Sequence, residues 1–266
     1  MIVVARLYSD SFSMTLPLER RESSGDYRDR LYQRYVSQQM ATDVARLRAT
    51  LDAGQPYYRQ LVERHMPADR NAAILDIGCG YGPLLYELKR AGYTKASGVD
   101  TSPEQVRVAH ELGLDSVREG DVAGTLAATP DASLDAVAAI DVIEHFTKDE
   151  VLTLLDHVYR VLKPGGVFLV HVPNGEAIFA GKIFFGDFTH QVAFTRKSIA
   201  QVARACGFSS VQCYEDKPIA HGLASAVRAF LWWAIRTKYR FINAAETGEG
   251  GSELILSQNL LAVCRK

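Results

Sequence analysis

The sequence lacks the features that mark disulfide-rich, membrane-spanning and nucleic-acid-binding proteins. Its four cysteines are scattered and form no C-x-x-C pair, which argues against a disulfide framework or a zinc site. No apolar run is long enough to span a bilayer, and the N-terminus gains charge too early for a signal peptide. A net charge of −1 without a Lys/Arg run predicts no nucleic-acid partner. We therefore expect a cytoplasmic protein.

What the chain does have is a strand, a glycine loop and a helix in direct succession. Residues 73–77 are mostly apolar and predict a buried parallel strand. Gly78, Gly80 and Gly82 follow, and their lack of a Cβ atom lets the backbone approach a ligand closely. Residues 83–90 open on a proline and have helical spacing. This order predicts a nucleotide-type site at the carboxyl edge of a parallel sheet.

Two acids narrow the ligand that this site would hold. A second predicted strand ends at Asp100, where a carboxylate can accept hydrogen bonds from two ribose hydroxyls. NAD and S-adenosylmethionine sites share that feature, but the third glycine here comes one residue earlier than in the dinucleotide motif G-x-G-x-x-G. Asp76 beside the loop would repel a pyrophosphate and suit the ammonium group of a methionine moiety. Together these residues favour S-adenosylmethionine.

Five motifs in order resemble those of the class I S-adenosylmethionine-dependent methyltransferases. They lie at residues 75–82, 98–105, 119–122, 134–146 and 161–168. The resemblance implies an α/β fold, a seven-stranded doubly wound (Rossmann-like) sheet with its last strand antiparallel, covered by an N-terminal helical cap. It also implies that Asp121 binds the adenine amino group and that the Val122 amide meets a ring nitrogen, although an ordinary surface turn is the alternative for this pair. The implied cofactor-binding residues are Asp76, Gly78, Cys79, Gly80, Gly82, Asp100, Thr101, Gln105, Asp121, Val122 and Asp141.

We expect two parts in the chain. Residues 1–66 would form the N-terminal lead and helical cap, in which Tyr32, Arg34 and Tyr35 either touch the ligands or only pack the helix. Residues 67–266 would form the methyltransferase domain, with a helical insertion at about 216–256. Within it, residues 222–241 have a helical pattern whose apolar centre has aromatic and basic flanks. Three roles stay open for this helix: contact with a membrane surface, a homodimer interface, or packing on the sheet.

Polar residues follow the fourth predicted strand. Asp141, Glu144 and His145 share one face if a helical turn begins there. His145 could accept a proton from the acceptor, or the cluster could bind a divalent metal together with His190, as the resemblance to small-RNA 2′-O-methyltransferases and some ubiquinone-pathway O-methyltransferases implies. In a third interpretation the carboxylates cap the next helix. We favour the proton-transfer interpretation and assign no metal ligand.

A second polar cluster follows the fifth predicted strand. Its D-x-T-H sequence at residues 187–190 would face the departing methyl group. We predict that His190 is the general base and that Asp187 orients it, although a lone histidine also serves structural roles. The predicted catalytic set is therefore His190, His145, Asp187 and Glu144.

The predicted reaction is methyl transfer from S-adenosylmethionine to an oxygen. Residues 186–190 and 246–248 resemble methyltransferases of polysaccharide-assembly clusters, which makes a saccharide or polysaccharide-precursor hydroxyl the leading acceptor. The glycine-rich residues 246–251 would then form a loop over it. A small aromatic or quinone-type hydroxyl is the alternative acceptor. An NAD(P)-dependent Rossmann oxidoreductase or epimerase is the alternative from another class.

Overall fold

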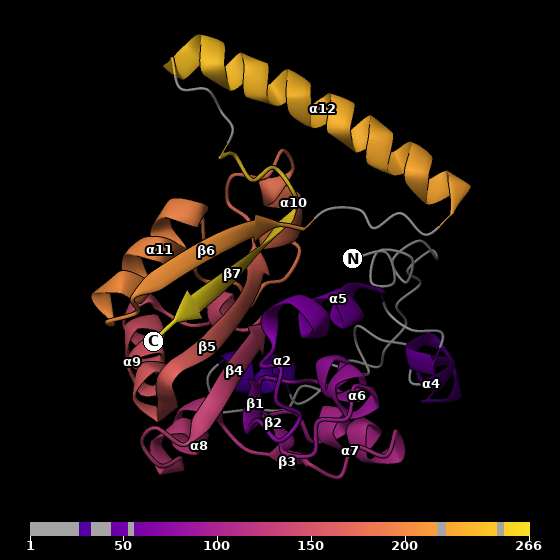
Figure 1. Ribbon diagram of the computed structural model, residues 1–266, viewed down its shortest axis with the longest axis vertical. Helices are drawn as coiled ribbons and strands as arrows, with labels where there is room; N and C mark the ends of the chain where they lie inside the picture. Colours follow the sequence, from indigo (N-terminus) through magenta and orange to yellow (C-terminus); the bar gives the residue numbers. More distant parts are fainter. Residues whose placement is uncertain (1–26, 33–43, 53–55, 217–221, 249–252) are drawn as a thin grey trace.

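The computed structural model describes residues 27–32, 44–52, 56–216, 222–248 and 253–266. Within them, seven strands form one sheet in the order β3-β2-β1-β4-β5-β7-β6 (Figure 1). The pairs from β3 to β5 are parallel, whereas β7 runs antiparallel to both β5 and β6. This sheet confirms the predicted seven-stranded doubly wound fold and its antiparallel last strand.

The element bounds follow the predicted order closely. The strands are Ile74–Ile77 (β1), Ala96–Asp100 (β2), Val117–Glu119 (β3), Leu134–Ile140 (β4), Leu162–Pro173 (β5), Ser210–Glu215 (β6) and Asn259–Arg265 (β7). The helices are Tyr27–Tyr32 (α2), Val44–Asp52 (α4), Pro56–His65 (α5), Pro83–Arg90 (α6), Pro103–Glu111 (α7), Val122–Ala128 (α8), Lys148–Val161 (α9), Ala180–Phe184 (α10), Arg196–Ala205 (α11) and Leu223–Thr247 (α12), with a 3₁₀ turn at Ile143–His145 (η1). None of the helices in the described ranges is both long and apolar enough to cross a membrane.

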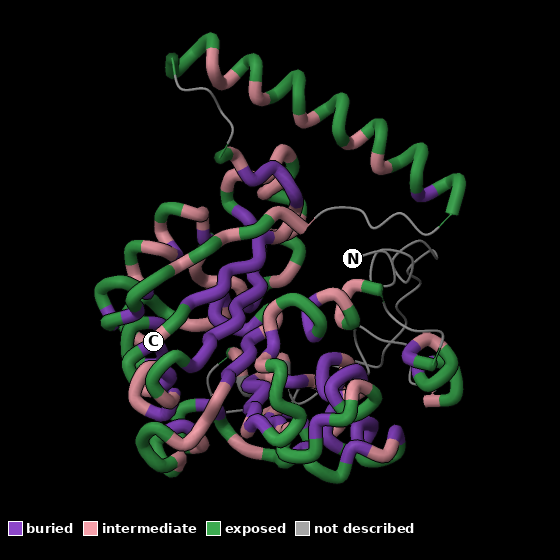
Figure 2. Tube along the Cα trace, in the orientation of Figure 1, coloured by how far each residue is buried: buried purple, intermediate pink, exposed green. Residues whose placement is uncertain are grey.

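Helices cover both faces of the sheet, and the buried strands lie between them (Figures 1 and 2). One apolar core joins the sheet to α8, α9 and α11, and the other joins it to α5, α6 and α7. Strand β1 contributes side chains to both cores: Ile74 faces the α6 side, whereas Leu75 and Ile77 face the α9 side. Because strand side chains alternate, Asp76 shares the α6 side with Ile74.

Two boundaries differ from the prediction. The expected turn at residues 164–166 lies inside β5, because pairing with β4 already begins at Leu162 and shifts register after Leu134, with Gly165 at a φ of 76°. Such an irregularity admits extra residues without ending the strand. Helix α12 continues to Thr247, so Glu246 and Thr247 belong to the helix and not to the expected loop. Residues 249–252 of that loop lie outside the described residues, as do Arg34 and Tyr35.

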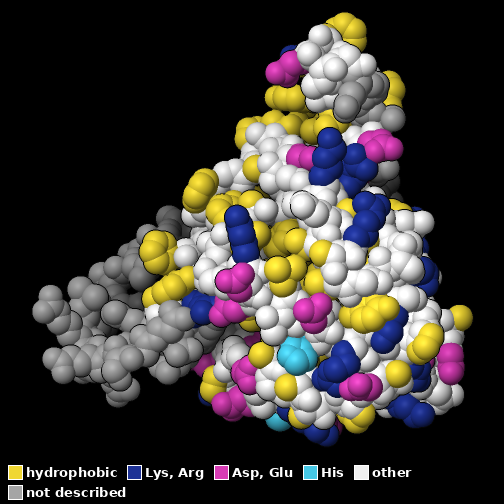
Figure 3. Space-filling view, turned by 90° about the vertical axis from the view of Figure 1, so that its left-hand side faces the viewer, with side chains coloured by type: hydrophobic (Ala, Val, Ile, Leu, Met, Phe, Trp, Pro, Cys, Tyr) yellow, Lys and Arg dark blue, Asp and Glu magenta, His cyan; other side chains and the backbone are white. Residues whose placement is uncertain are grey.

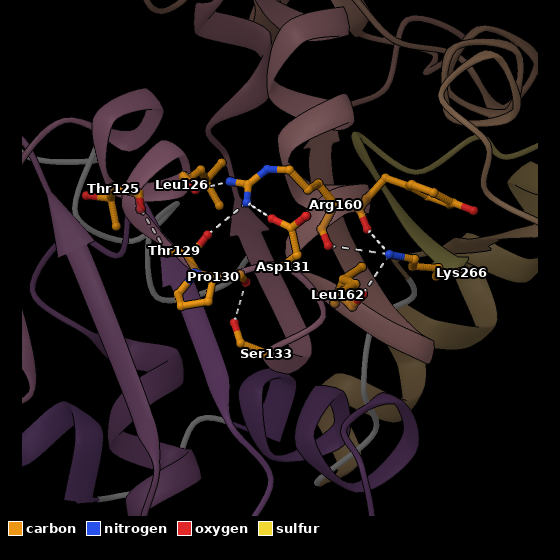
Figure 4. Close-up of polar contacts among 10 residues, drawn as sticks. Thr125, Leu126, Thr129, Pro130, Asp131, Ser133, Arg160, Leu162 and Lys266 are labelled. Carbon is orange, nitrogen blue, oxygen red and sulfur yellow. Dashed lines mark hydrogen bonds and ion pairs between the residues drawn. The ribbon is translucent and has the colours of Figure 1, made fainter.

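The amino-end edge of the parallel strands carries a fully hydrogen-bonded polar cluster (Figure 4). Arg160, in the last turn of α9, donates to the carbonyls of Leu126 (2.6 Å) and Thr129 (2.9 Å) and pairs with Asp131. Lys266 donates through Nζ to the carbonyl of Leu162 at 2.8 Å and to that of Tyr159 at 2.6 Å. These cations satisfy carbonyls that a helix C-terminus leaves without an intrahelical donor.

Candidate functional site

The glycine loop between β1 and α6 lies at the carboxyl edge of the sheet. Gly78 and Gly82 have φ values of 62° and 81°, in the left-handed region that favours glycine. A Cβ atom on Gly78 would lie 2.6 Å from Val142 Cγ2, and one on Gly82 would lie 2.5 Å from Leu114 Cδ1. The loop therefore needs glycine at both positions for its conformation and for its packing.

Asp100 at the end of β2 fixes the centre of this loop. Its Oδ2 accepts a hydrogen bond from the Gly80 amide at 2.7 Å, and its Oδ1 accepts one from the Ser102 amide at 2.9 Å. Burial raises the pKa of Asp100, and the two amides oppose that rise. Cys79 is buried, and its amide donates a hydrogen bond to the Val99 carbonyl, which connects the loop to β2.

Buried polar atoms without hydrogen-bond partners surround the loop. Asp76 is 2% exposed and its Oδ1 accepts no hydrogen bond within the described part of the chain. Burial, followed by the charge of Asp100, raises the pKa of Asp76 well above its ordinary value. Gln105 is also buried, and its Oε1 has no hydrogen-bond partner within the described part of the chain. Its side chain lies beside the loop, 3.8 Å from the position that a Cβ atom on Gly80 would take. Because native proteins satisfy nearly all such atoms, these groups are suited to a polar, cationic ligand.

The predicted adenine end lies at the start of α8. Asp121 is the N-cap of this helix, and its carboxylate accepts hydrogen bonds from the amides of Ala123 and Gly124. Val122 is the first helical residue, a position whose N–H has no intrahelical acceptor. Thr101 lies exposed just beyond β2. The structure thus gives Asp121 a capping role, and its contact with adenine stays a prediction.

Asp141 ends β4 in a strained conformation, with a φ of 56° that few non-glycine residues adopt. His171 of β5 holds it there: Nδ1 lies 2.7 Å from Asp141 Oδ1, while Nε2 lies 3.6 Å from Asp216 Oδ2. Desolvation would lower the pKa of His171, but the charges of both carboxylates prevail and raise it to about 10. The same histidine charge outweighs desolvation at Asp141 and holds the pKa of that carboxyl below its ordinary value.

Sequence reasoning missed His171, Asp216 and the aromatic residues that close over them. Tyr57 of α5 packs its ring 5.5 Å from that of His171, and its buried hydroxyl has no hydrogen-bond partner among the described residues. Burial raises the pKa of Tyr57 and of the neighbouring Tyr58 well above the ordinary tyrosine value. The only signal in the sequence was a histidine inside an otherwise apolar strand.

The two predicted catalytic segments meet at η1. The amides of Gln191 and Val192 both donate to the Glu144 carbonyl, at 2.7 and 3.1 Å, and the Gln191 side chain donates to the His145 carbonyl. The interpretation in which the carboxylates of Asp141 and Glu144 cap the next helix is wrong, because Thr147 and Glu150 form the capping box of α9. Asp141 pairs with His171 and does not continue the turn into η1.

Hydrogen bonds fix the tautomer of His145. The Thr189 hydroxyl donates its one proton to Asp187 Oδ1 at 2.6 Å. His145 Nδ1, 2.7 Å from the same hydroxyl oxygen, must therefore be the donor in that contact, so the lone pair of the neutral ring lies on Nε2. Desolvation and the neighbouring His190 lower the pKa of His145 to about 4, which keeps the ring neutral near pH 7. Asp187 thus reaches His145 through Thr189.

His190 has the same tautomer for a different reason. Its Nδ1 lies 2.9 Å from the Phe184 carbonyl, which can only accept, so Nδ1 carries the proton and Nε2 the lone pair. The two imidazole rings lie 4.8 Å apart between centroids. Nε2 of His190 points toward Glu144 Oε1 at 3.9 Å. The ring that we predicted Asp187 to orient is therefore held by the backbone of Phe184.

Glu144 completes this cluster as a fully buried carboxyl group. Neither of its oxygens has a hydrogen-bond partner in the described ranges, and burial together with the charge of Asp141 raises its pKa well above the ordinary value. Glu144, His145 and His190 offer ligand atoms that all lie within 4.8 Å of one another. Two lone pairs beside a desolvated carboxyl can bind an acceptor hydroxyl, accept its proton or hold a divalent cation.

Comparison with known proteins agrees with this geometry. A family model described as a methyltransferase domain matches residues 32–213. The ubiquinone biosynthesis O-methyltransferase of Xanthomonas oryzae pv. oryzae (strain PXO99A) is 35% identical over 114 residues, which cover 41% of this chain and 46% of that protein. The chain thus matches about half the length of its curated relatives.

Solved structures show the same fold at low sequence identity. A SAM-dependent methyltransferase from Archaeoglobus fulgidus superposes with a TM-score of 0.58 at 21% identity, over 91% of this chain and 100% of that one. Phosphoethanolamine N-methyltransferase 2 of Haemonchus contortus, in complex with S-adenosyl-L-methionine, gives a TM-score of 0.61 at 17% identity, over 92% of this chain and 61% of that one. The family match covers more than half of this chain. The chain therefore belongs to the methyltransferase family and has the class I S-adenosylmethionine-dependent methyltransferase fold.

Proposed function

We propose that this chain transfers the methyl group of S-adenosylmethionine to a hydroxyl oxygen of a small-molecule or saccharide acceptor. The observation that carries the proposal is the cluster of Glu144, His145 and His190, whose ligand atoms lie within 4.8 Å of one another and whose carboxyl has no hydrogen-bond partner among the described residues. The family match and the glycine loop support the cofactor half of the proposal. The same observations favour methyl transfer over the nicotinamide-dependent alternative.

The cofactor's charges match the loop. The Asp100 carboxylate is already aligned by two amides and keeps lone pairs for ribose hydroxyls. Asp76, which is buried and whose Oδ1 has no hydrogen-bond partner in the described part of the chain, would ionise against the ammonium group of the methionine moiety. Gly78 and Gly82 give the loop the left-handed backbone conformation and the close packing on Val142 and Leu114 that hold it in place. When bound, S-adenosylmethionine supplies a methyl carbon that is already electrophilic.

Positioning therefore does most of the catalytic work. The hydroxyl proton of the acceptor passes to Nε2 of His190 as the oxygen forms its bond to the methyl carbon and the carbon–sulfur bond breaks, which leaves S-adenosylhomocysteine. His145, kept neutral by desolvation, would accept a hydrogen bond from a second hydroxyl of the acceptor. Thr189 and Asp187 preserve its tautomer throughout. An alcohol of high pKa gains most from such a base.

Two acceptor classes fit this cluster. The curated relatives are ubiquinone biosynthesis O-methyltransferases, which supports a small aromatic or quinone-type hydroxyl. A saccharide hydroxyl is supported by the presence of a general base, because a sugar alcohol needs deprotonation more than a phenol does. We place the aromatic hydroxyl first, since a measured sequence relationship supports it.

A bound divalent cation is the second candidate for the chemistry of this cluster. The residues fit one: Glu144 would supply a carboxylate oxygen, and His145 and His190 would supply the lone pairs that their hydrogen bonds leave on Nε2. The cation would polarise the acceptor oxygen and lower the pKa of its hydroxyl. The carboxyl that is costly to bury without a partner would then be ionised and paired.

Radiolabel transfer from S-adenosylmethionine tests the proposal. Catechol-type phenols and a panel of sugars serve as acceptors, each with and without EDTA. Methylation of either class that His190→Gln reduces at least a hundredfold supports the proton-transfer assignment. Loss of activity in EDTA, restored by Mg²⁺ or Mn²⁺, assigns the cluster to a metal. Oxidation of an acceptor by NAD, with no methyl transfer in any condition, would contradict the proposed function.

A further inference from the structure

Helix α12 stands apart from the body of the protein (Figure 1), and most of its residues are exposed (Figure 2). It has 25 residues, of which only Ser225 is buried. Phe230 is 63% exposed, Leu231 54% and Phe241 74%. Globular proteins scatter single exposed apolar residues over their surface, but a continuous stripe of them marks a contact site.

The stripe faces away from the protein. At 100° per residue, seven of the nine large exposed apolar residues of α12 fall within about 140° of the helix circumference; they are Leu223, Val227, Phe230, Leu231, Ile235, Phe241 and Ile242. The opposite face points to the body: Arg236 pairs there with Glu215, and Arg240 donates to the Leu254 carbonyl. The helix is therefore amphipathic in the reverse sense, with its polar face inward.

Most charged side chains of the helix are cationic, and its one acid, Glu246, lies in the last turn. Between residues 223 and 245 the sequence has four cationic side chains and no Asp or Glu. Arg236 is neutralised by Glu215. Arg228 and Lys238 have no ion-pair partner within the described residues; Arg228 borders the stripe, and Lys238 rises from it on a long aliphatic stem. Trp233 and Tyr239 flank the stripe on either side, where amphipathic rings suit the boundary between water and acyl chains.

Further positive charge lies beside the helix. A hollow of about 890 Å³ between α11, β6 and α12 is lined by four cationic residues, Arg196, Lys197, Arg204 and Arg240, and by two acids, Glu215 and Glu253. Figure 3 shows Lys and Arg side chains on this side of the molecule, below its apolar top. Arg196 pairs with Glu253, whereas Lys197 and Arg204 are exposed cations. A region that combines apolar, aromatic and cationic groups, with Glu246 as the one acid of its helix, is complementary to an anionic surface.

We propose that α12 docks this protein on an anionic lipid surface, with the stripe inserted among the headgroups and acyl chains and Arg228 and Lys238 on lipid phosphates. A second copy of the chain is the less suitable partner, since antiparallel pairing of two α12 helices would bring several cations together with only Glu246 of each helix to offset them. Figure 1 shows α12 beyond the carboxyl ends of the parallel strands, on the same side as α10 and the candidate site. Docking would thus bring the site close to an acceptor held in the lipid.

Vesicle co-sedimentation tests this proposal directly. Wild-type protein is mixed with vesicles of phosphatidylcholine alone and of equal parts phosphatidylcholine and phosphatidylglycerol. We expect sedimentation with the anionic vesicles only, and a partition coefficient that falls roughly 30-fold in Arg228→Gln/Lys238→Gln, from the usual contribution of two cations near a charged surface. Phe230→Ser/Leu231→Ser should reduce it at least tenfold. Leu152→Ser, which changes an exposed apolar residue on α9, is the matched control and should bind like wild type.

Circular dichroism and S-adenosylmethionine titration of each variant show whether it is folded, so loss of docking is separated from loss of structure. Wild-type protein that stays in the supernatant with anionic vesicles would overturn the proposal. A dimer in light scattering that Phe230→Ser/Leu231→Ser converts to a monomer, without vesicle binding, would overturn it in favour of a second copy. Methyl transfer with intact activity but no vesicle binding would refute the docking surface alone and leave the proposed function standing.

Discussion

The two edges of the sheet differ in whether their polar atoms have hydrogen-bond partners within the described residues. At the amino-end edge, Arg160 and Lys266 donate to helix and strand carbonyls and leave them satisfied (Figure 4). At the carboxyl-end edge, oxygens of Asp76, Gln105 and Glu144 lie buried without hydrogen-bond partners in the part of the chain that the structure describes. A buried polar atom without a partner is unfavourable. The difference indicates that the first edge serves stability and that the second is completed by ligands.

The largest effect of a substitution is expected at Glu144, at the edge that lacks hydrogen-bond partners. Glu144→Gln should lower kcat for methyl transfer about 10²-fold, the low end of the usual contribution of a positioned acid or base, because Glu144 Oε1 lies 3.9 Å from Nε2 of His190 and an amide cannot offset the charge that this ring gains with the acceptor's proton. The melting temperature should stay equal or rise, because the amide does not pay the desolvation penalty of a buried carboxyl. Asp149→Asn, on an exposed residue of α9, serves as the control and should change neither quantity. A variant that unfolds while its residual activity per folded molecule is normal would assign Glu144 to stability.

The next effect depends on pH and concerns His171. Its pKa of about 10 in the folded protein lies above the ordinary 6.5 of an unfolded chain, so protonated His171 stabilises the fold fully below pH 6.5. That contribution declines by about 1.4 kcal/mol per pH unit as the pH rises toward 10. Urea unfolding of wild type and His171→Asn should therefore show a difference in stability that shrinks between pH 7 and pH 10. A constant difference for His171→Asn would show that its role is packing.

A smaller effect is expected at Asp100. Asp100→Asn keeps the size of the side chain but replaces one acceptor oxygen of the pair that binds Gly80 and Ser102. We expect the Kd for S-adenosylmethionine to rise about tenfold to a hundredfold, since hydrogen bonds to a charged group contribute about 1.5–3 kcal/mol. Isothermal titration calorimetry measures it. An unchanged Kd would remove Asp100 from the cofactor site.

The smallest effect belongs to the satisfied edge. Arg160→Met removes hydrogen bonds to Leu126 and Thr129 on a partly exposed side chain, so the free energy of unfolding should fall by about 1–2 kcal/mol. The kcat of the folded enzyme should not change. A loss of activity without a loss of stability would mean that this edge also takes part in function, and the contrast between the edges would fail.

Local sequence patterns were sufficient for most of the fold. Gly78 and Gly82 marked the loop because their φ values exclude other residues, and the proline-led helix at residues 83–90 has the predicted bounds. The start of β5 was not predictable, because it depends on pairing of Leu162 with Leu134 in another strand. The placement of α12 was equally out of reach: an amphipathic pattern defines two faces but not which one turns toward the body.

The site residues also fall into those that the sequence revealed and those that depend on contacts between distant segments. Residues at strand ends, such as Asp100 and Asp141, were recognisable because parallel strands deliver their carboxyl ends to one edge. His171 was missed because its role comes from Asp141 and Asp216, which lie 30 and 45 residues away in the sequence. The tautomers of His145 and His190 depend on Thr189 and on the Phe184 carbonyl, and no spacing encodes those contacts.

The most direct test of the central claim is proton release when S-adenosylmethionine binds. Calorimetric titrations in buffers of different ionisation enthalpy, from pH 5 to pH 8, count the protons. If Asp76 is held protonated by burial and ionises against the ligand's ammonium group, wild type should release a proton over part of this range, and Asp76→Asn should bind more weakly and release none. Binding of equal strength by both proteins, without proton release at any pH, would contradict the account.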